Sequence, residues 1–295
     1  MSVQWQNQEL EINGARLYVA RSGGAEQPAV ILVHGFSDNG RCWPRLSADL
    51  AKHYDVIVPD ARGHGRSARI VPGEKTDPTA DLAGIIQRLG LERPVVVGHS
   101  MGASTAAQLG ARFPDHVRAL ILEDPPWRPY PERPALLSMK PGNLEAEQMK
   151  PPPAAAPTPD ANPLKRWIES LEGLTVEAIA EENRAEYPGW PRDVLLRWSQ
   201  AKQEFDRNFF LRKEAHPMGW PEVVDVIRCP TLLITSEPDR GGIITPQLAQ
   251  EVMERNPAFT VVKIGGVGHH IRFEAYDRYR DAVFEFLEKL DRSEG

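Results

Sequence analysis

Cysteine is almost absent from this sequence of 295 residues, which contains only Cys42 and Cys229. Two cysteines far apart in the chain exclude a disulfide framework, and they are too few to form a structural zinc site by themselves. We expect each to be a small, buried, apolar side chain rather than a reactive thiol. The sequence also lacks the H-E-x-x-H spacing that places two histidines on one helical face. We therefore predict no metal site and no cofactor.

Long apolar runs and an excess of positive charge are missing as well. No stretch approaches 18 uninterrupted apolar residues, and residues 1–10 contain no basic patch followed by an apolar run. The sequence thus predicts neither a membrane span nor a signal peptide. The formal net charge of −6 leaves no basic excess for phosphates, which argues against nucleic acid or an anionic membrane as a partner. We expect a cytoplasmic protein, and homodimer formation is left open.

Short runs rich in β-branched residues recur along the first part of the chain. Such runs, without polar alternation, are typical of strands buried on both faces of a parallel sheet. Segments with helical spacing lie between them, and this alternation favours a doubly wound, mostly parallel α/β sheet. The predicted strands are 16–21, AVILV (29–33), DVIVP (55–59), PVVVG (94–98) and ALIL (119–122), and the helices are 43–52, 79–89 and 101–113.

The pattern breaks after residue 122. Prolines crowd residues 125–163, and because proline fixes φ and removes a backbone donor, we expect an irregular or extended arm there. The next 50 residues or so have helical spacing (164–171, 175–187 and 192–210) and no obvious strand. The α/β pattern then resumes with strands at 231–235 and 260–264 and a terminal helix at 275–290. We therefore predict one core, 1–125 with 221–295, interrupted by a helical cap at 126–220.

The strongest chemical signal is Gly98-His99-Ser100-Met101-Gly102, directly after a predicted strand and before a helix of small residues. This is G-x-S-x-G in a strand–turn–helix context, in which the serine is a nucleophile on a strained turn. A Cβ at either flanking glycine would collide with the neighbouring strand or helix. We predict that Ser100 is the nucleophile.

A serine hydroxyl is a weak nucleophile, so it needs a general base and a group that orients this base. His269 follows a glycine-rich loop (265–268) after the last predicted strand, which places it over the carboxyl end of the sheet. We predict that His269 is the base, with the adjacent His270 as the alternative.

Three carboxylates follow the ends of predicted strands, where α/β active sites collect. Asp239 and Glu237 come after strand 231–235, and Asp124 comes after strand 119–122. The order Ser100, Asp239, His269 follows the nucleophile–acid–base order of such enzymes. We favour Asp239 as the orienting acid and keep Asp124 and Glu237 as alternatives.

The oxyanion of an acyl-transfer reaction needs backbone N–H donors that are already in position. Met101 can supply one at the start of the helix after Ser100, where the helix dipole adds to it. The loop His34-Gly35-Phe36 follows the first buried strand, and we expect Phe36 to supply the second N–H.

These motifs together resemble the capped α/β-hydrolase superfamily. The matching pieces are VHGF (33–36), DARGHGRS (60–67), GHSMG (98–102), LLITSEPD (232–239) and GVGHH (266–270), in the family's order and across the whole chain except the insert. The resemblance implies that Ser100, Asp239 and His269 form a catalytic triad and that Phe36 and Met101 form the oxyanion hole. It also implies that Asp60, Arg62 and His64 serve loop architecture, and that reactions needing an aspartate nucleophile are excluded.

The insert is expected to cover Ser100 as a lid and to exclude water. Its aromatic side chains predict a hydrophobic substrate pocket, for which we name Trp127, Trp167, Trp190 and Trp198. The leading hypothesis is hydrolysis of a carboxylic ester or lactone with a hydrophobic portion, through an acyl-enzyme on Ser100. One alternative is C–C bond hydrolysis of a diketone-like acid, with Arg166, Arg184, Arg192 and Arg197 as candidates for binding its carboxylate. The other is a ligand receptor that keeps the triad.

Overall fold

The computed structural model describes residues 4–23, 26–127, 162–215 and 218–294. Its centre is a sheet of eight strands in the order β1-β2-β4-β3-β6-β7-β9-β10. The β1–β2 and β2–β4 pairings are antiparallel, and every pairing from β4 to β10 is parallel. The strands are β1 (Gln6–Ile12), β2 (Ala15–Arg21), β3 (Ala29–Val33), β4 (Asp55–Pro59), β6 (Val95–His99), β7 (Ala119–Glu123), β9 (Thr231–Thr235) and β10 (Phe259–Lys263). The predicted fold class is confirmed.

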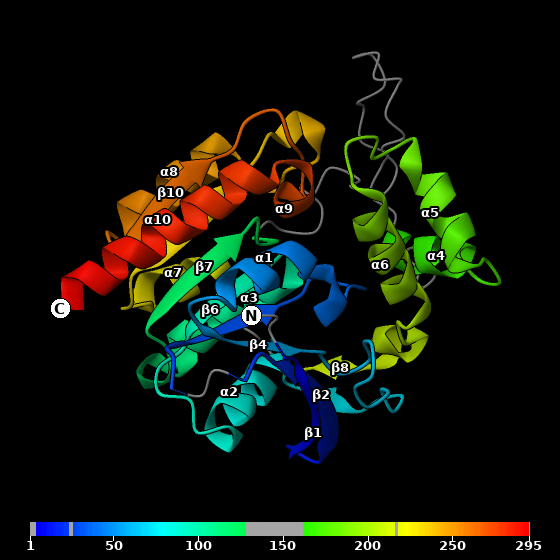
Figure 1. Cartoon of the computed structure of the whole chain (residues 1–295), viewed down its shortest axis with the longest axis horizontal. Helices are drawn as coiled ribbons and strands as arrows, with labels where there is room; N and C mark the ends of the chain where they lie inside the picture. The colour runs from blue at the N-terminus through cyan, green and yellow to red at the C-terminus, as the bar shows by residue number, and fades with distance from the viewer. Residues whose placement is uncertain (1–3, 24–25, 128–161, 216–217, 295) are drawn as a thin grey trace.

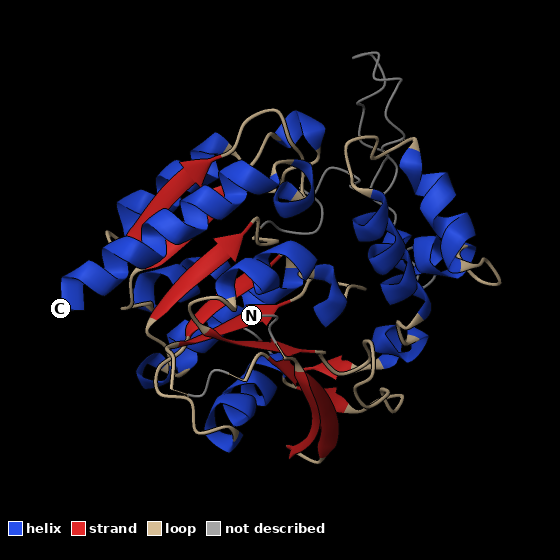
Figure 2. Ribbon diagram, viewed as in Figure 1, coloured by secondary structure: helices blue, strands red, loops and turns tan. Residues whose placement is uncertain are grey.

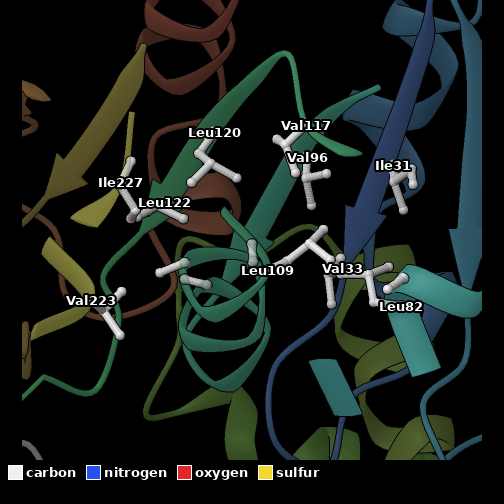
Figure 3. Close-up of a cluster of buried hydrophobic side chains, with 14 of the residues drawn as sticks. Ile31, Val33, Leu82, Val96, Leu109, Val117, Leu120, Leu122, Val223 and Ile227 are labelled. Atoms are coloured by element: carbon white, nitrogen blue, oxygen red, sulfur yellow. The ribbon is translucent and has the colours of Figure 1, made fainter. Parts of the chain in front are cut away.

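Side chains of the central strands alternate between two apolar cores, one on each face of the sheet. Along β3, Val30 and Leu32 lie in one core, and Ile31 and Val33 lie in the other. A strand that is covered on both faces offers no position where a polar side chain reaches water, which explains the short apolar runs. Figure 3 shows the core that contains Ile31 and Val33, with Leu109 of helix α3 packed against it.

Helices cover both faces of the sheet (Figure 2). Helices α1 and α10 contribute to one core, and α2, α3, α7 and α8 contribute to the other. Among the described residues, no helix combines the length and the apolar composition needed to cross a bilayer. The helices of the core are α1 (Pro44–Leu50), α2 (Pro78–Arg88), α3 (Met101–Arg112), α7 (Trp220–Val226), α8 (Pro246–Arg255), α9 (Ile271–Glu274) and α10 (Tyr276–Glu294).

Three strands lie where the sequence pattern predicts none. β1 is an edge strand in which only Leu10 and Ile12 are buried, so it leaves little apolar signal. β8 (Lys213–Glu214) lies inside the predicted helical insert and pairs in parallel with β5 (Lys75–Thr76). Such a two-residue strand has no period that a sequence pattern could reveal.

Helices α4 (Pro163–Ser170), α5 (Val176–Arg184) and α6 (Arg192–Gln203) come between β7 and β9 in the chain. Figure 1 shows them grouped at one side of the sheet, and α6 contacts the short helix η1 (Gly40–Cys42) that follows β3. They lie where the sequence predicts a helical cap, a name that we keep for these helices, and their role as a lid over Ser100 stays a prediction. The limits of the cap at 126 and 220 stay a prediction, and the predicted proline-rich arm falls mainly on residues 128–161, outside the described residues.

Candidate active site

Ser100 occupies the sharp turn between β6 and α3. Its φ is 51° and its ψ is −118°, a backbone conformation that costs a non-glycine residue about 1–3 kcal/mol. The flanking glycines permit this turn, because a Cβ at Gly98 would lie 2.6 Å from the Ala103 nitrogen and one at Gly102 would lie 2.5 Å from the His34 carbonyl oxygen. The turn places Ser100 at the carboxyl end of β6, as the sequence predicts.

Two backbone N–H groups next to Ser100 donate to no other described residue. One belongs to Met101, the first residue of α3, where the helix dipole concentrates positive potential. The other belongs to Phe36 in the loop after β3. This loop touches the turn, since a Cβ at Gly35 would lie 3.3 Å from the Ser100 Cβ. These are the donors that the sequence predicts for an oxyanion hole, and that role stays a prediction.

His269 donates its Nδ1–H to the Asp124 carboxylate, with 2.6 Å between Nδ1 and Oδ2. The carboxylate is fully buried, and the imidazole is 18% exposed. A proton on Nδ1 leaves Nε2 as an acceptor. The backbone of His269 is fixed near the serine turn, because its carbonyl accepts a hydrogen bond from Nε2 of His99 at 3.1 Å. An oriented imidazole near Ser100 is the arrangement that a general base requires.

Asp124 is held by backbone N–H groups of the loop that follows β9. It directly follows β7, with φ of 44°. Its carboxylate accepts the N–H of Ile243 at 2.9 and 3.0 Å and the N–H of Ile244 at 3.0 Å. The chain reaches this position by turning at Gly241, which adopts a φ of 95°. These hydrogen bonds fix the carboxylate where it can orient His269.

The structure does not bring the favoured acid, Asp239, to His269. Asp239 is exposed in the short helix η6 (Pro238–Arg240). The second alternative, Glu237, pairs with Lys263 at 2.8 Å between Oε2 and Nζ. Of the three candidate acids, Asp124 is the one that contacts His269, so the geometry favours Asp124, an alternative in the sequence prediction, over Asp239. The physical reason is that the backbone donors after Gly241 meet at the end of β7, not at the end of β9.

His34 and His64 use both ring nitrogens on backbone groups. Burial lowers the pKa of His34 and lowers that of His64 further, so both rings are neutral at pH 7. Their partners are Gly35 and Ala61 for His34, and Arg62 and Ser37 for His64. These contacts tie the loops after β3 and β4 together, which is the architectural role that the sequence predicts for His64.

His270, the alternative base, lies among aromatic side chains of the cap. Its ring is stacked on Phe273 with centroids 5.7 Å apart, and it contacts Trp190 edge-on at 5.0 Å. Burial lowers its pKa well below the ordinary value, and the neighbouring His269 lowers it further. Its Nδ1 has no hydrogen-bond partner among the described residues. His270 therefore lacks the carboxylate that orients His269.

Four buried charges beside the site were missed by sequence reasoning. Asp38 binds Lys202 at 2.6 Å and Arg272 at 2.9 Å, and Arg272 also lies 3.4 Å from Glu123. Burial opposes ionisation of Asp38, yet Lys202 and Arg272 hold its pKa far below the ordinary value. Burial raises the pKa of Glu123, and Arg272 offsets this in part. Nothing in the sequence separates these residues from the solvated charges around them.

This charge cluster joins four segments of the site. Lys202 comes from cap helix α6, Asp38 from the loop after β3, Glu123 from the end of β7, and Arg272 from α9. All four side chains are at most 2% exposed. Removal of one partner would leave an unpaired buried charge, which is strongly destabilising. The cluster therefore fixes the cap to the carboxyl ends of the central strands, where Ser100 lies.

The four tryptophans predicted to line a substrate pocket divide into two groups. Trp127 stacks on Trp220 with ring centroids 6.2 Å apart and belongs to the core of the sheet. Trp167, Trp190 and Trp198 pack together inside the cap. None of the four lines the cavity described next, so their role in binding a substrate stays a prediction.

A mostly apolar cavity lies next to the serine turn. Met101 lines it, as do Leu82 and Ile85 of α2 and two residues that follow α6, Phe209 and Arg212. It therefore begins one residue from Ser100 and extends between the sheet and α2. Nothing in the sequence pattern indicated this cavity, because its walls come from segments far apart in the chain. In the described ranges, no group of three or more His, Cys, Asp or Glu could hold a metal ion.

A model of the alpha/beta hydrolase family matches residues 30–284. The chain belongs to the alpha/beta hydrolase family. The match contains the serine turn, Asp124 and His269, as well as the residues of the cap. The predicted resemblance is thus confirmed, and membership of this family supports an enzyme.

Three alpha/beta hydrolases illustrate the similarity. The chain is 26% identical to the N-formylmaleamate deformylase of Pseudomonas putida over 94% of each protein. The structure is similar to E-2-(acetamidomethylene)succinate hydrolase, with a TM-score of 0.72, 20% identity, and coverage of 97% of this chain and 100% of the other. It is also similar to the enol-lactonase of Burkholderia xenovorans LB400, with a TM-score of 0.69, 19% identity, and coverage of 95% and 100%. The two structural similarities concern the fold.

Proposed function

We propose that this alpha/beta hydrolase cleaves a small carboxylic ester or lactone with a hydrophobic portion, through an acyl-enzyme on Ser100. The observation that carries the proposal is the hydrogen bond from His269 Nδ1 to Asp124 beside the strained turn of Ser100. The proposed triad is Ser100, His269 and Asp124.

Acylation begins when His269 Nε2 takes the proton of the Ser100 hydroxyl as its oxygen attacks the ester carbonyl. Among the described residues the Ser100 hydroxyl has no hydrogen-bond partner. In unliganded hydrolases such bonds are often long, and they tighten when the substrate binds. Asp124 keeps the proton of the imidazole on Nδ1 and stabilises the imidazolium that forms.

The tetrahedral intermediate carries its negative charge on the former carbonyl oxygen. The N–H groups of Met101 and Phe36 stabilise this charge. Loss of either donor is expected to lower the rate about 10²–10³-fold. His269 then gives its proton to the leaving alkoxide, and the acyl group stays on Ser100. A water molecule activated by His269 attacks the acyl-enzyme, which releases the acid and restores the serine.

The apolar cavity next to Met101 supports the proposal that the substrate has a hydrophobic portion. A panel of p-nitrophenyl esters tests this part of the proposal. We expect kcat/KM to rise from the acetate to the hexanoate, because each buried methylene contributes about 0.8 kcal/mol. Activity that falls along this series contradicts the hydrophobic pocket, and a full rate in Ser100→Ala contradicts the nucleophile.

Hydrolysis of an activated amide is the second candidate. It is favoured by the similarity over nearly the whole chain to a protein named N-formylmaleamate deformylase. The same triad serves both reactions, since only the leaving group differs. Direct comparison of kcat/KM for an ester and the matching N-formyl or N-acetyl enamide decides between them, and faster cleavage of the amide would displace the ester proposal.

The two other hypotheses receive less support. All four arginines named for binding a substrate carboxylate in C–C bond hydrolysis, Arg166, Arg184, Arg192 and Arg197, are exposed. A receptor would keep the triad but show single-turnover or negligible rates. Continuous turnover of an ester at substrate excess excludes the receptor.

A further inference from the structure

Two buried polar atoms in the wall of the apolar cavity lack hydrogen-bond partners. They are Oγ1 of Thr76 and Nε of Arg212. Thr76 is 3% exposed. A buried donor without a partner costs about 1–3 kcal/mol, so two such atoms in one cavity wall point to a ligand that satisfies them.

The local backbone brings these two atoms to the same wall. Thr76 belongs to β5, and Arg212 directly precedes β8, which pairs with β5. The Lys213 N–H donates to the Glu74 carbonyl, and the Ala215 N–H donates to the Thr76 carbonyl. This two-stranded ribbon places both residues in the cavity wall, and the guanidinium carbon of Arg212 lies 3.4 Å from the centroid of the Phe209 ring.

The guanidinium of Arg212 already has two partners within the protein. Its Nη1 donates to the Phe209 carbonyl at 2.6 Å, and its Nη2 pairs with Glu214 at 3.2 Å. Burial lowers the pKa of Arg212, and Glu214 only partly offsets this. Nη1 and Nη2 thus each hold a partner within the protein, and Nε is the guanidinium nitrogen without one among the described residues.

The other charged residues of the cavity wall disfavour an anionic ligand. Arg62 is already bound to Asp81 at 2.6 Å and to Glu74 at 2.9 Å. Asp60, also in the wall, accepts hydrogen bonds from backbone N–H groups only. A buried carboxylate would add a negative charge to a wall whose cations are already paired with acids, which is costly without full compensation.

We propose that this cavity binds the apolar arm of the substrate through a neutral carbonyl oxygen on that arm, which accepts hydrogen bonds from Arg212 Nε and Thr76 Oγ1. A carbonyl oxygen has two lone pairs and carries no net charge, so it matches two single donors in an apolar wall. This inference rests on the proposed function only in assigning the ligand as the substrate of Ser100.

The first test measures binding without catalysis. Ser100→Ala protein is titrated by calorimetry with 2-hexanone, 1-hexene and hexanoate, which have the same number of carbons. We expect the ketone to bind about fivefold or more tighter than the alkene, the worth of roughly one net hydrogen bond, and tighter than the carboxylate. Tighter binding of hexanoate overturns the choice of a neutral oxygen.

Two threonine variants, added to Ser100→Ala, locate the donor. Thr76→Val removes the unpartnered hydroxyl, whereas Thr105→Val removes a hydroxyl in the same cavity wall that already donates to the Met101 carbonyl at 3.0 Å. The preference for the ketone should drop about fivefold in Thr76→Val and persist in Thr105→Val. An unchanged preference in Thr76→Val overturns the inference, since the ketone would then bind elsewhere, for example at the oxyanion hole.

Stability provides a readout that also verifies folding. Since the Thr76 hydroxyl has no partner, Thr76→Val should melt at the same temperature as the parent protein or higher. Arg212→Lys, which keeps a charge but lacks Nε–H, should lose the preference for the ketone as well. A clear loss of stability in Thr76→Val contradicts the account, because the hydroxyl would then have a partner within the protein.

The final test uses substrates and separates this inference from the proposed function. The substrates are p-nitrophenyl 4-oxopentanoate, 5-oxohexanoate and 6-oxoheptanoate, each compared with the unsubstituted ester of equal length. At one chain length, kcat/KM of the oxo ester should exceed that of the unsubstituted ester more than about fivefold. Thr76→Val should abolish this excess. If the esters are cleaved but the oxo esters show no such excess, the inference about the cavity is contradicted and the proposed function is not. If no ester is cleaved, the proposed function fails, and the binding data still decide the inference.

Discussion

The ends of β7 and β9 lie side by side in the sheet and both carry acidic residues, yet only one of them holds an acid against His269. At the end of β7, Asp124 is fully buried and receives two backbone N–H groups. At the end of β9, Asp239 is exposed, and Glu237 forms a partly exposed ion pair with Lys263. The contrast teaches that burial and backbone donors, rather than position in a motif, select the acid that orients the histidine.

Replacement of each carboxylate by an amide tests the comparison between the two strand ends most directly. Asp124→Asn should lower kcat by about 10⁴-fold, because an amide no longer fixes the imidazole tautomer. Asp239→Asn should stay within about twofold, as an exposed surface substitution does. Hydrolysis of p-nitrophenyl hexanoate measures both. A larger loss in Asp239→Asn than in Asp124→Asn would assign the acid to β9.

The pH dependence of stability tests the surroundings of His269, the partner of Asp124. The rings of His99 and His270 flank that of His269. Burial lowers the pKa of both well below the ordinary value. As the pH falls through about 6.5, the unfolded chain binds protons that the folded chain does not, so the free energy of unfolding decreases. Each imidazole contributes up to about 1.4 kcal/mol per pH unit.

Urea unfolding at pH 7.5, 6.5 and 5.5 measures this dependence. We expect constant stability near the upper end of the range and a steep decrease below pH 6.5. Constant stability down to pH 5.5 contradicts the buried, neutral state of these two rings.

Gly242 lies in the loop after β9 and directly precedes Ile243 and Ile244, whose N–H groups donate to Asp124 at the end of β7. A Cβ at this position would press against the Ser236 hydroxyl and lie 2.9 Å from the Glu237 carbonyl oxygen. Gly242→Ala should shift the donors and lower kcat by about 10–100-fold, the cost of a misplacement near 1 Å. Gly189→Ala is the matched control, since its Cβ would meet nothing within 4 Å. Equal activity of the two variants would show that the donors do not position Asp124.

The smallest effect is expected at Glu237. Its ion pair with Lys263 is partly exposed at both side chains, and such pairs contribute about 0–1 kcal/mol. Glu237→Gln should leave kcat within about twofold and change the melting temperature slightly. A loss of activity similar to that of Asp124→Asn would mean that the β9 side takes part in catalysis.

The serine turn could be predicted because its determinants are local. Gly98 and Gly102 are needed within two residues of Ser100, and a buried strand and a helix of small residues flank them. The central strands were predictable for the same reason, since burial on both faces leaves a continuous apolar run. The edge strand β1 was missed, because an edge buries only a few side chains and leaves a weak pattern.

The acid, the charge cluster and the cavity could not be predicted from local patterns. Asp124 is selected by N–H groups of Ile243 and Ile244, more than a hundred residues later. The turn Arg240-Gly241-Gly242 follows β9 and directly precedes these donors in the chain. In the cluster and the cavity, the relevant contacts likewise join segments far apart in the chain, so they emerge only from tertiary packing.

Labelling with a fluorophosphonate, with the adduct located by mass spectrometry, tests the central claim most directly. The account predicts one adduct on Ser100, formed at nearly the native rate in Asp239→Asn and far more slowly in Asp124→Asn. An adduct on another residue, or equal labelling rates in Asp124→Asn and the native protein, would contradict a nucleophile activated by His269 and Asp124.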